Sequence, residues 1–417
     1  MPYTVLTIAP TSFFADYGNH VRIWEEVKTL RNLGHRVVMT TYHNGDNMPG
    51  LEIRRTWDVP WIKRAMVGSS RHKLYLDVAL LWRTLQVALE VRPDIVHAHI
   101  HEGALIGALA SRLLRIPLIF DYQGSLTGEM LDHGFLRRES VVYPPMRTLE
   151  QIINHLPDAV ITSSYNAASV LHHQWGFPRD RLYTVPDSVN TERFRPFDGS
   201  PGWEAERERL RAELGIPAGR RLVVYLGLLA PYQGTNKLIE AARIVVERRP
   251  DVHFLVMGYP DVVSYSALAE ALGVRDHVTL PGRILYRDAH AYLALGDVAV
   301  APKMSETEGA GKITNYLAMG LPVVAFDTPV SREILGNVGR YARFGDVQSL
   351  AEELIGLLDD PREMEILSAA GRAKAVRDHS WELGALQIQA IYERALARRA
   401  GRPLPPVPTV LGSIPFK

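Results

Sequence analysis

The sequence predicts an α/β protein with two doubly wound domains, in which helices flank mostly parallel sheets. One observation is the start of the chain, where strand Tyr3–Ala9, a helix over residues 20–33 and strand Arg36–Thr41 follow one another. This β-loop-α-β order begins a doubly wound sheet. A second observation is that the same alternation starts again at Leu222–Leu226. The third is the length of 417 residues, which suffices for two domains with full cores.

The other elements of the first half follow from apolar runs bounded by turn residues. Strands are expected at Leu51–Arg55, Asp94–His99, Pro117–Asp121, Ala159–Thr162 and Leu182–Val185. An amphipathic helix, interrupted by charges and so not a membrane span, is expected at Leu74–Val91. Its helically spaced apolar residues are Val78, Leu81, Trp82, Leu85 and Leu89. Residues 126–145 carry few periodic cues and are expected to form a mobile acceptor loop.

The second half repeats the alternation of strands and helices. Its further strands are expected at His253–Met257, Val278–Leu280, Val298–Ala301 and Pro322–Phe326, and a last long helix at Trp381–Arg399. A turn-rich segment at Pro186–Phe194 marks the link between the halves. The predicted organisation is therefore a first domain at 1–190, a second at 191–380, a closing helix at 381–400 and a proline-rich tail at 401–417.

Composition excludes several functions. With 47 basic and 46 acidic residues, the chain lacks the concentrated positive charge of a general nucleic-acid binder. It has no cysteine, which removes disulfides, thiolate zinc sites and cysteine nucleophiles. Neither of the first two strands is followed by Gly-x-Gly-x-x-Gly, so no nicotinamide or flavin cofactor is expected. The first ten residues form a strand pattern without a basic leader, so a cytoplasmic location is expected.

The segment Ser305–Ala325 is the best candidate for a binding site. An acidic, glycine-rich loop leads into a short helix, Ile313–Met319, and then a buried strand. Such a loop directs backbone N–H groups at a ligand, and its glycines allow a phosphate or sugar to come close. Lys312 could meet an anion, and Glu306 and Glu308 could hold hydroxyls. The alternative is an ordinary strand-to-helix turn with solvated charges.

Histidines cluster where the strand Asp94–His99 ends. If that strand continues, alternation places His97, His99 and His101 on one face. A metal cluster is one interpretation. Contact with substrate, or simple bonding to neighbours, is the preferred one, because ligands of open α/β sheets sit at the carboxyl edge.

A basic stretch over residues 61–73 precedes the amphipathic helix. It holds Lys63, Arg64, Arg71, His72 and Lys73. An acceptor site or contact with the inner face of an anionic membrane is one interpretation. The other, a solvated basic loop, is preferred because this half of the chain is nearly neutral.

Five short motifs resemble those of family 4 glycosyltransferases, and they occur along the chain in the same order as in that family. They are Glu308-Gly-Ala-Gly311 with Gly320-Leu-Pro-Val-Val-Ala325, Gly18-Asn-His20 followed by Leu33–Val37, Asp94–His99, Val185–Phe194, and Ser380–Glu382. The resemblance covers nearly the whole chain. It implies the GT-B fold, two Rossmann-like domains facing a central cleft, with a closing helix that crosses back to the first domain. It also implies a retaining hexosyltransferase that uses a nucleotide sugar.

Several charged site residues of the family are replaced here. The arginine and lysine that hold the donor diphosphate align with Leu228 and Gln233, and the ribose-binding glutamate aligns with Asn315. The glutamate facing the sugar aligns with Thr307 or Glu308, and a histidine of the first domain with Gln123.

The resemblance implies roles for the matching residues. Those expected at the catalytic centre are Glu308, Gln123, His99 and Glu102; at the donor, Gly18, Lys312, Gly309, Gly311, Asn315, Gln233 and Arg283; at the acceptor, His20 and His101. Lys312, helped by Lys303 or Arg283, is the hypothetical replacement for the missing cations. No metal is expected, since no Asp-x-Asp motif ends a strand.

Three functions remain open from the sequence. The leading one is a retaining, metal-independent transferase that moves a sugar from a nucleotide to a glycan, lipid or small-molecule hydroxyl, with no further cofactor. The second is a sugar phosphorylase or a transferase with a nucleoside monophosphate donor, which needs fewer cations. The third is a non-catalytic partner protein, and a sugar-nucleotide epimerase is more distant. The donor base, the acceptor and the oligomeric state do not follow from the sequence.

Overall fold

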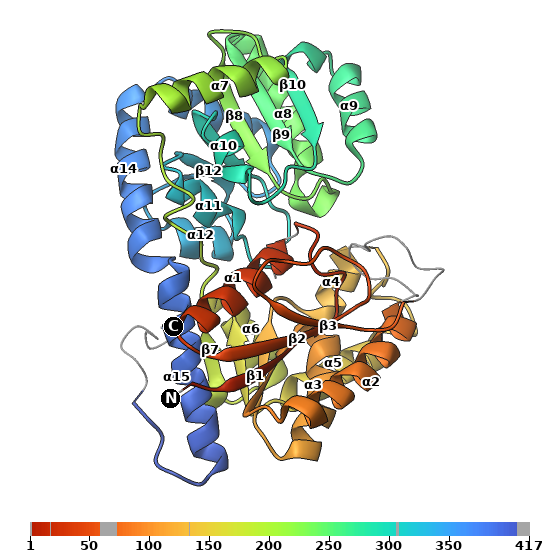
Figure 1. The fold of residues 1–417 in the computed structure, drawn as a ribbon. Helices are drawn as coiled ribbons and strands as arrows, with labels where there is room; N and C mark the ends of the chain where they lie inside the picture. The colour runs from red at the N-terminus through yellow and green to blue at the C-terminus, as the bar shows by residue number, and fades with distance from the viewer. Residues whose placement is uncertain (1, 17, 59–72, 133, 306–307, 407–417) are drawn as a thin grey trace. The chain divides into compact units, whose positions relative to one another are not determined.

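The computed structural model describes residues 2–16, 18–58, 73–132, 134–305 and 308–406, so the basic stretch is described only at Lys73. The chain forms two compact units (Figure 1). One comprises Met1–Asp187, Thr307–Gly309 and Trp381–Lys417, and the other Ser188–Glu306 and Ala310–Ser380. Each unit contains one parallel sheet, of 7 strands in the first and 6 in the second, which confirms the predicted α/β class.

The first sheet has the order β3-β2-β1-β4-β5-β6-β7. Its strands are β1 (Thr4–Ala9), β2 (Arg36–Thr41), β3 (Glu52–Arg55), β4 (Ile95–His99), β5 (Leu118–Tyr122), β6 (Ala159–Thr162) and β7 (Leu182–Thr184). Val5 pairs with Val37 on one side and Ile95 on the other, so β1 lies inside the sheet. The β4 and β5 side chains are fully buried, as expected for parallel strands covered on both faces.

Helices cover both faces of the first sheet. They are α1 (Gly18–Asn32), α2 (Lys73–Val91), α3 (Ile100–Leu114), α4 (Leu126–Asp132), α5 (Tyr143–His155), α6 (Tyr165–Trp175), the 3₁₀ turn η1 (Arg179–Arg181) and α15 (Trp381–Arg399). The last helix packs against α1 of this unit. Arg394 donates to the Tyr183 hydroxyl at 3.0 Å, and Arg399 pairs with Asp158 at 2.8 Å.

The second sheet has the order β10-β9-β8-β11-β12-β13. Its strands are β8 (Arg221–Leu226), β9 (Val252–Met257), β10 (Val278–Gly282), β11 (Val298–Ala301), β12 (Val323–Phe326) and β13 (Arg340–Ala342); the last was not predicted. Its helices and turns are α7 (Pro201–Glu213), η2 (Pro231–Gln233), α8 (Thr235–Arg248), α9 (Val262–Ala271), η3 (Arg275–His277), α10 (Ala289–Leu293), α11 (Lys312–Ala318), α12 (Pro329–Leu335), α13 (Val347–Leu358) and α14 (Pro361–Asp378).

The structure corrects the predicted loop at 126–145. Helix α4 occupies its start, and α5 begins at Tyr143, with Pro144 and Pro145 in the first turn, where proline is tolerated. The buried Glu150 carboxylate accepts the Thr127 backbone N–H at 2.9 Å and so caps α4 from α5. Local periodicity could not reveal a cap that lies 23 residues away.

Helix α2 forms where the sequence predicted an amphipathic helix, and the structure shows which of its sides is buried. The spacing that predicted the amphipathic helix includes Val78 and Trp82, but these side chains are 63% and 56% exposed. The buried stripe is instead Leu76, Leu80 and Val87. Because α2 is apolar on both sides, periodicity alone could not identify the side that packs on the sheet. None of the described helices is both long enough and apolar enough to span a bilayer.

Candidate active site

A lysine lies at the carboxyl edge of the second sheet. The Lys312 ammonium, at the start of α11, donates to the Gln233 side-chain oxygen at 2.9 Å and to the Tyr225 hydroxyl at 3.0 Å. It also lies 4.3 Å from the centre of the Tyr225 ring, a cation–π contact. Strand β8 and the turn η2 that follows it therefore hold, together with α11 some 79 residues after Gln233, one positive charge at the place where ligands of open α/β sheets bind.

The surrounding backbone leaves room for this charge. A Cβ at Gly227 would lie 2.7 Å from the Lys312 ammonium nitrogen. Gly234 has a φ of +75°, and a Cβ there would lie 1.7 Å from the Pro302 carbonyl oxygen. Burial raises the pKa of Tyr225 well above its ordinary value, so its hydroxyl stays protonated and donates to the Leu228 carbonyl at 2.7 Å. Close approach to the backbone therefore requires glycine at Gly234, whereas a side chain at Gly227 would displace the flexible end of Lys312.

The other residues that were expected to bind the donor do not all lie beside Lys312. Asn315 is half-buried on α11, close to Lys312 in sequence, and Gly311 caps that helix without a side-chain bond. The exposed Arg283 lies over the Tyr259 ring at 5.6 Å. Glu308 and Gly309 group with the first unit, while Lys303 is buried. Thr307, the alternative match for the sugar-facing glutamate, and Glu306 lie outside the described residues.

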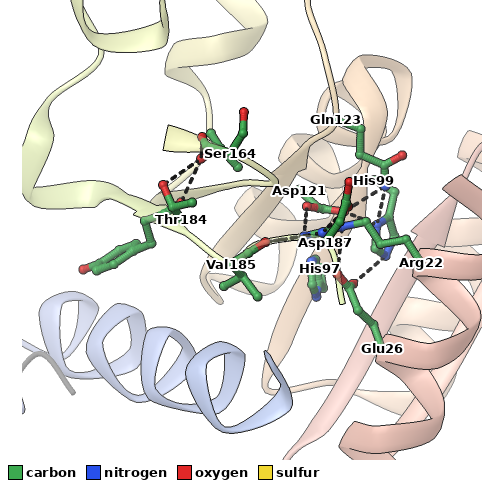
Figure 2. Close-up of polar contacts among 12 residues, drawn as sticks. Arg22, Glu26, His97, His99, Asp121, Gln123, Ser164, Thr184, Val185 and Asp187 are labelled. Atoms are coloured by element: carbon green, nitrogen blue, oxygen red, sulfur yellow. Dashed lines mark hydrogen bonds and ion pairs between the residues drawn. The ribbon is translucent and has the colours of Figure 1, made fainter. Parts of the chain in front are cut away.

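A buried carboxylate organises the edge of the first sheet. Asp121, at the end of β5, accepts two bonds from the Arg22 guanidinium, at 3.0 and 3.1 Å. It also binds His99 Nδ1 at 3.0 Å and accepts the Gln123 amide N–H at 2.8 Å. Figure 2 shows these side chains converging on Asp121. Arg22 further pairs with Asp187 at 3.0 Å.

This network fixes the orientation of Gln123. Burial alone raises the pKa of Asp121, but Arg22 and His99 outweigh it and hold the pKa well below the ordinary range. An ionised carboxylate only accepts hydrogen bonds, so Gln123 must present its N–H to it. The Gln123 carbonyl oxygen is therefore left as a hydrogen-bond acceptor.

The strand with the histidines does not continue as assumed. It ends at His99, and Ile100 takes a φ of +53° as α3 begins. His97 and His99 stack with ring centres 4.7 Å apart. His101 instead lies on α3, buried against the rings of Phe120 and Tyr122 and bonded to Asn154 at 3.1 Å. The three histidines therefore do not form one group.

The remaining expected residues lie near α1 and α3. His20 is fully buried and accepts the Ala15 backbone N–H at 2.9 Å, with Thr11 on its other nitrogen. At Gly18 a Cβ would meet nothing within 4 Å. Glu102 pairs with Lys73 at 2.7 Å; burial alone raises its pKa, but Lys73 outweighs burial and lowers it.

Sequence reasoning assigned no site role to Arg22, Asp121 or Tyr225. Asp121 and Tyr225 were predicted only as strand residues, and Arg22 as part of a helix. A polar residue at the end of an otherwise apolar strand, such as Asp121, is a usable signal. Arg22 offered none, because its partners are 99 and 165 residues away.

Two family profiles match the chain. "Glycosyltransferase Family 4" matches residues 18–193, and "Glycosyl transferases group 1" matches residues 206–374. Together they account for most of both units.

Individual relatives are distant. An MMP alpha-(1->4)-mannosyltransferase from Mycolicibacterium hassiacum is 29% identical over 60% of this chain and 57% of that protein. A D-inositol 3-phosphate glycosyltransferase from Thermobispora bispora is 24% identical over 91% and 90%. Sucrose-phosphate synthase from Thermosynechococcus elongatus has a TM-score of 0.79 at 19% identity, covering 95% of this chain and 100% of that one. Anabaena HepE, solved with UDP and glucose, has a TM-score of 0.74 at 18% identity, covering 93% and 98%.

The two parallel sheets and these structural likenesses define the GT-B fold, as the motifs predicted. With both profiles matched in order, the chain belongs to glycosyltransferase family 4 and is a glycosyltransferase.

Proposed function

We propose that this glycosyltransferase moves a hexose from a nucleoside diphosphate donor to a hydroxyl acceptor with retention of configuration, without a catalytic metal or further cofactor. The observation that carries the proposal is the position of Lys312. Its ammonium lies 2.9 Å from Gln233, the residue that stands where the family has a donor-binding lysine. The Lys312 ammonium from α11 therefore lies next to the position at which the family has a lysine in the loop after β8.

Charge at this position suits the chemistry of the transfer. As the bond between the sugar and the phosphate breaks, negative charge grows on the leaving phosphate. A preorganised cation stabilises that charge without reorganisation. The bonds to Gln233 and Tyr225 hold the ammonium in place. Because Lys312 supplies a positive charge here, the proposal assigns no divalent ion to the leaving group.

The first unit supplies hydrogen bonds and no cation in this proposal. The carbonyl oxygen of Gln123, fixed by Asp121, would accept a hydrogen bond from a sugar or acceptor hydroxyl. Arg22 is engaged by Asp121 and Asp187, so its charge is already balanced. The donor nucleotide is supported by the complexes of Anabaena HepE with UDP and with UDP-glucose.

The first test identifies the donor. Thermal unfolding would be followed with UDP, GDP, ADP, dTDP, CMP and inorganic phosphate. A ligand at about 100 times its dissociation constant adds about 2.7 kcal/mol of stability. We expect one diphosphate to raise the melting temperature in the wild type and less in Lys312→Ala, while the control Lys237→Ala behaves as wild type. Product analysis with the matching nucleotide sugar, with and without added Mg²⁺, follows. Stabilisation by phosphate or CMP alone would overturn the diphosphate donor.

A lipid surface is the proposed location of the acceptor. Helices α2, α3 and α5 pack side by side in the first unit and expose apolar residues: Tyr75, Val78, Trp82, Leu89, Leu105, Leu109, Leu113, Leu149 and Ile152. Apolar surface of this extent marks an interaction site, and Trp and Tyr suit the membrane interface. The exposed charges on these three helices are Arg112 and Arg147, which complement anionic headgroups, and the acidic Glu90 near the end of α2.

Vesicle sedimentation tests this surface. The wild type should pellet with phosphatidylcholine vesicles that contain phosphatidylglycerol, and much less with phosphatidylcholine alone. Val78→Asp should lower binding at least tenfold. The matched control is Val263→Asp, because Val263 is 81% exposed on α9 of the other unit. Equal binding by both variants, or none by the wild type, would contradict the proposal.

A further inference from the structure

Three buried side chains of the first unit offer metal-ligand atoms to one another. They are Glu26 on α1 and His97 and His99 on β4, each 1% exposed. One ligand atom from each lies within 4.8 Å of the others. The two histidines are two residues apart on a strand, so both point to the same face, toward Glu26 (Figure 2).

Each histidine is already held through its other ring nitrogen. His97 Nδ1 lies 2.6 Å from the Tyr392 hydroxyl, and His99 Nδ1 lies 3.0 Å from Asp121. Metal-ligating histidines usually have such partners, which fix the ring and its tautomer. His99 Nε2, the ring nitrogen that does not contact Asp121, lies 3.9 Å from a Glu26 carboxylate oxygen. Nε2 of His97 has no hydrogen-bond partner among the described residues.

Charge around Glu26 is not balanced. Both of its carboxylate oxygens lack a hydrogen bond within the described part of the chain. Arg22 lies 3.1 Å from one of them, but its N–H groups are directed to Asp121 and Asp187. Three carboxylates thus share one guanidinium. A buried carboxylate that accepts no hydrogen bond and shares its one guanidinium with two other carboxylates is costly, and a further cation or a proton would lower that cost.

We propose that Glu26, His97 and His99 bind a divalent transition-metal ion that stabilises the first unit. Two imidazoles and one carboxylate form a recognised ligand set for Zn²⁺ and Fe²⁺. Tetrahedral Zn²⁺, with Zn–N and Zn–O bonds of about 2.0–2.2 Å, separates two ligand atoms by about 3.3–3.6 Å. His99 Nε2 and Glu26 are 3.9 Å apart and all three ligand atoms lie within 4.8 Å of one another, so binding needs the side chains to move inward.

The ion would act on structure and not on the sugar. It would join α1 to β4 next to Asp121. The hydrogen bonds of Asp121 to His99 and Gln123 orient these two side chains in the candidate active site. The site lies wholly within the first unit, and its existence does not depend on the identity of the donor.

Metal content of the intact chain, purified without a polyhistidine tag, is the test. We expect about one equivalent of Zn²⁺ by elemental analysis, and after chelation, visible absorption bands on adding Co²⁺ that added Zn²⁺ removes. Glu26→Gln and His97→Gln should abolish binding. Tyr392→Phe should weaken it by about 10–100-fold, as expected for loss of an outer partner. The control His35→Gln removes another buried histidine of the unit and should bind normally.

The wild-type spectrum keeps the proposal falsifiable if a variant fails to fold. A wild type without bound metal, with no Co²⁺ bands and no change in melting temperature on adding Zn²⁺, would overturn it. A proton on Glu26 would then account for the charge. Binding that survives in both ligand variants would overturn it equally.

Discussion

Introducing the family's lysine at Gln233 tests whether Lys312 has taken over its role. The Gln233 oxygen now accepts the Lys312 ammonium at 2.9 Å, and Gln233 is only 7% exposed. Gln233→Lys would place two ammonium groups roughly 4 Å apart. At an effective dielectric constant near 20, their repulsion would be about 4 kcal/mol. Movement of the half-exposed Lys312 should reduce the net loss of stability to about 1–2 kcal/mol.

The assay is a double-mutant cycle with Lys312→Ala. The single Lys312→Ala should lower kcat/KM by about 10²–10³-fold, the usual effect of losing one group that stabilises developing charge. Gln233→Lys alone should lower the melting temperature by roughly 2–8 °C. In the Lys312→Ala background the same lysine meets no second charge, so it should cost less stability and restore activity at least tenfold. The coupling between the two changes is then read directly.

Two results would refute this reasoning. If Lys312→Ala retains full transfer activity, its ammonium does not stabilise the leaving phosphate. If the double variant is no more active than Lys312→Ala, a lysine at position 233 cannot replace Lys312 in stabilising the leaving phosphate. The control Lys237→Ala removes a lysine in the first turn of α8 that pairs with Glu240 at 3.6 Å, and it should alter neither activity nor melting temperature.

Two further predictions concern buried carboxylates. Asp121→Asn removes the charge that holds Arg22 and His99, so we expect a loss of about 3–5 kcal/mol in urea unfolding; a loss under 1 kcal/mol would contradict the network. Burial raises the pKa of Asp77 to about 6. The folded state therefore binds more protons than the unfolded state between about pH 4 and 6, and the free energy of unfolding falls as the pH rises through that range. Asp77→Asn keeps a hydrogen-bond acceptor for the Tyr42 hydroxyl but cannot ionise. Its free energy of unfolding should exceed that of the wild type by on the order of 3 kcal/mol at pH 7 and equal it at pH 4. A difference that does not change with pH would contradict this prediction.

The places where sequence reasoning failed share a cause. The apolar spacing that predicted α2 runs through the exposed Val78 and Trp82, because both sides of this helix are apolar. Helix α4 was missed because its first N–H groups are capped by Glu150 from the next helix. His101 was grouped with His97 because the end of β4 at Ile100 rests on a positive φ that no local residue pattern indicated. In each case a tertiary contact or a single backbone angle overrode a local pattern.

The sequence by itself determined the α/β class, the family and most of the strands and helices, although it missed α4 and β13. Those follow from periodicity, turn residues and short motifs, which act over a few positions. It also showed that Leu228 and Gln233 replace charged residues of the family. Only the tertiary structure decided which charges meet. Lys312 reaches Gln233 across 79 residues, and Arg22 reaches Asp121 across 99. Such contacts depend on the order of the strands within each sheet, and a pattern of a few neighbouring residues does not specify that order.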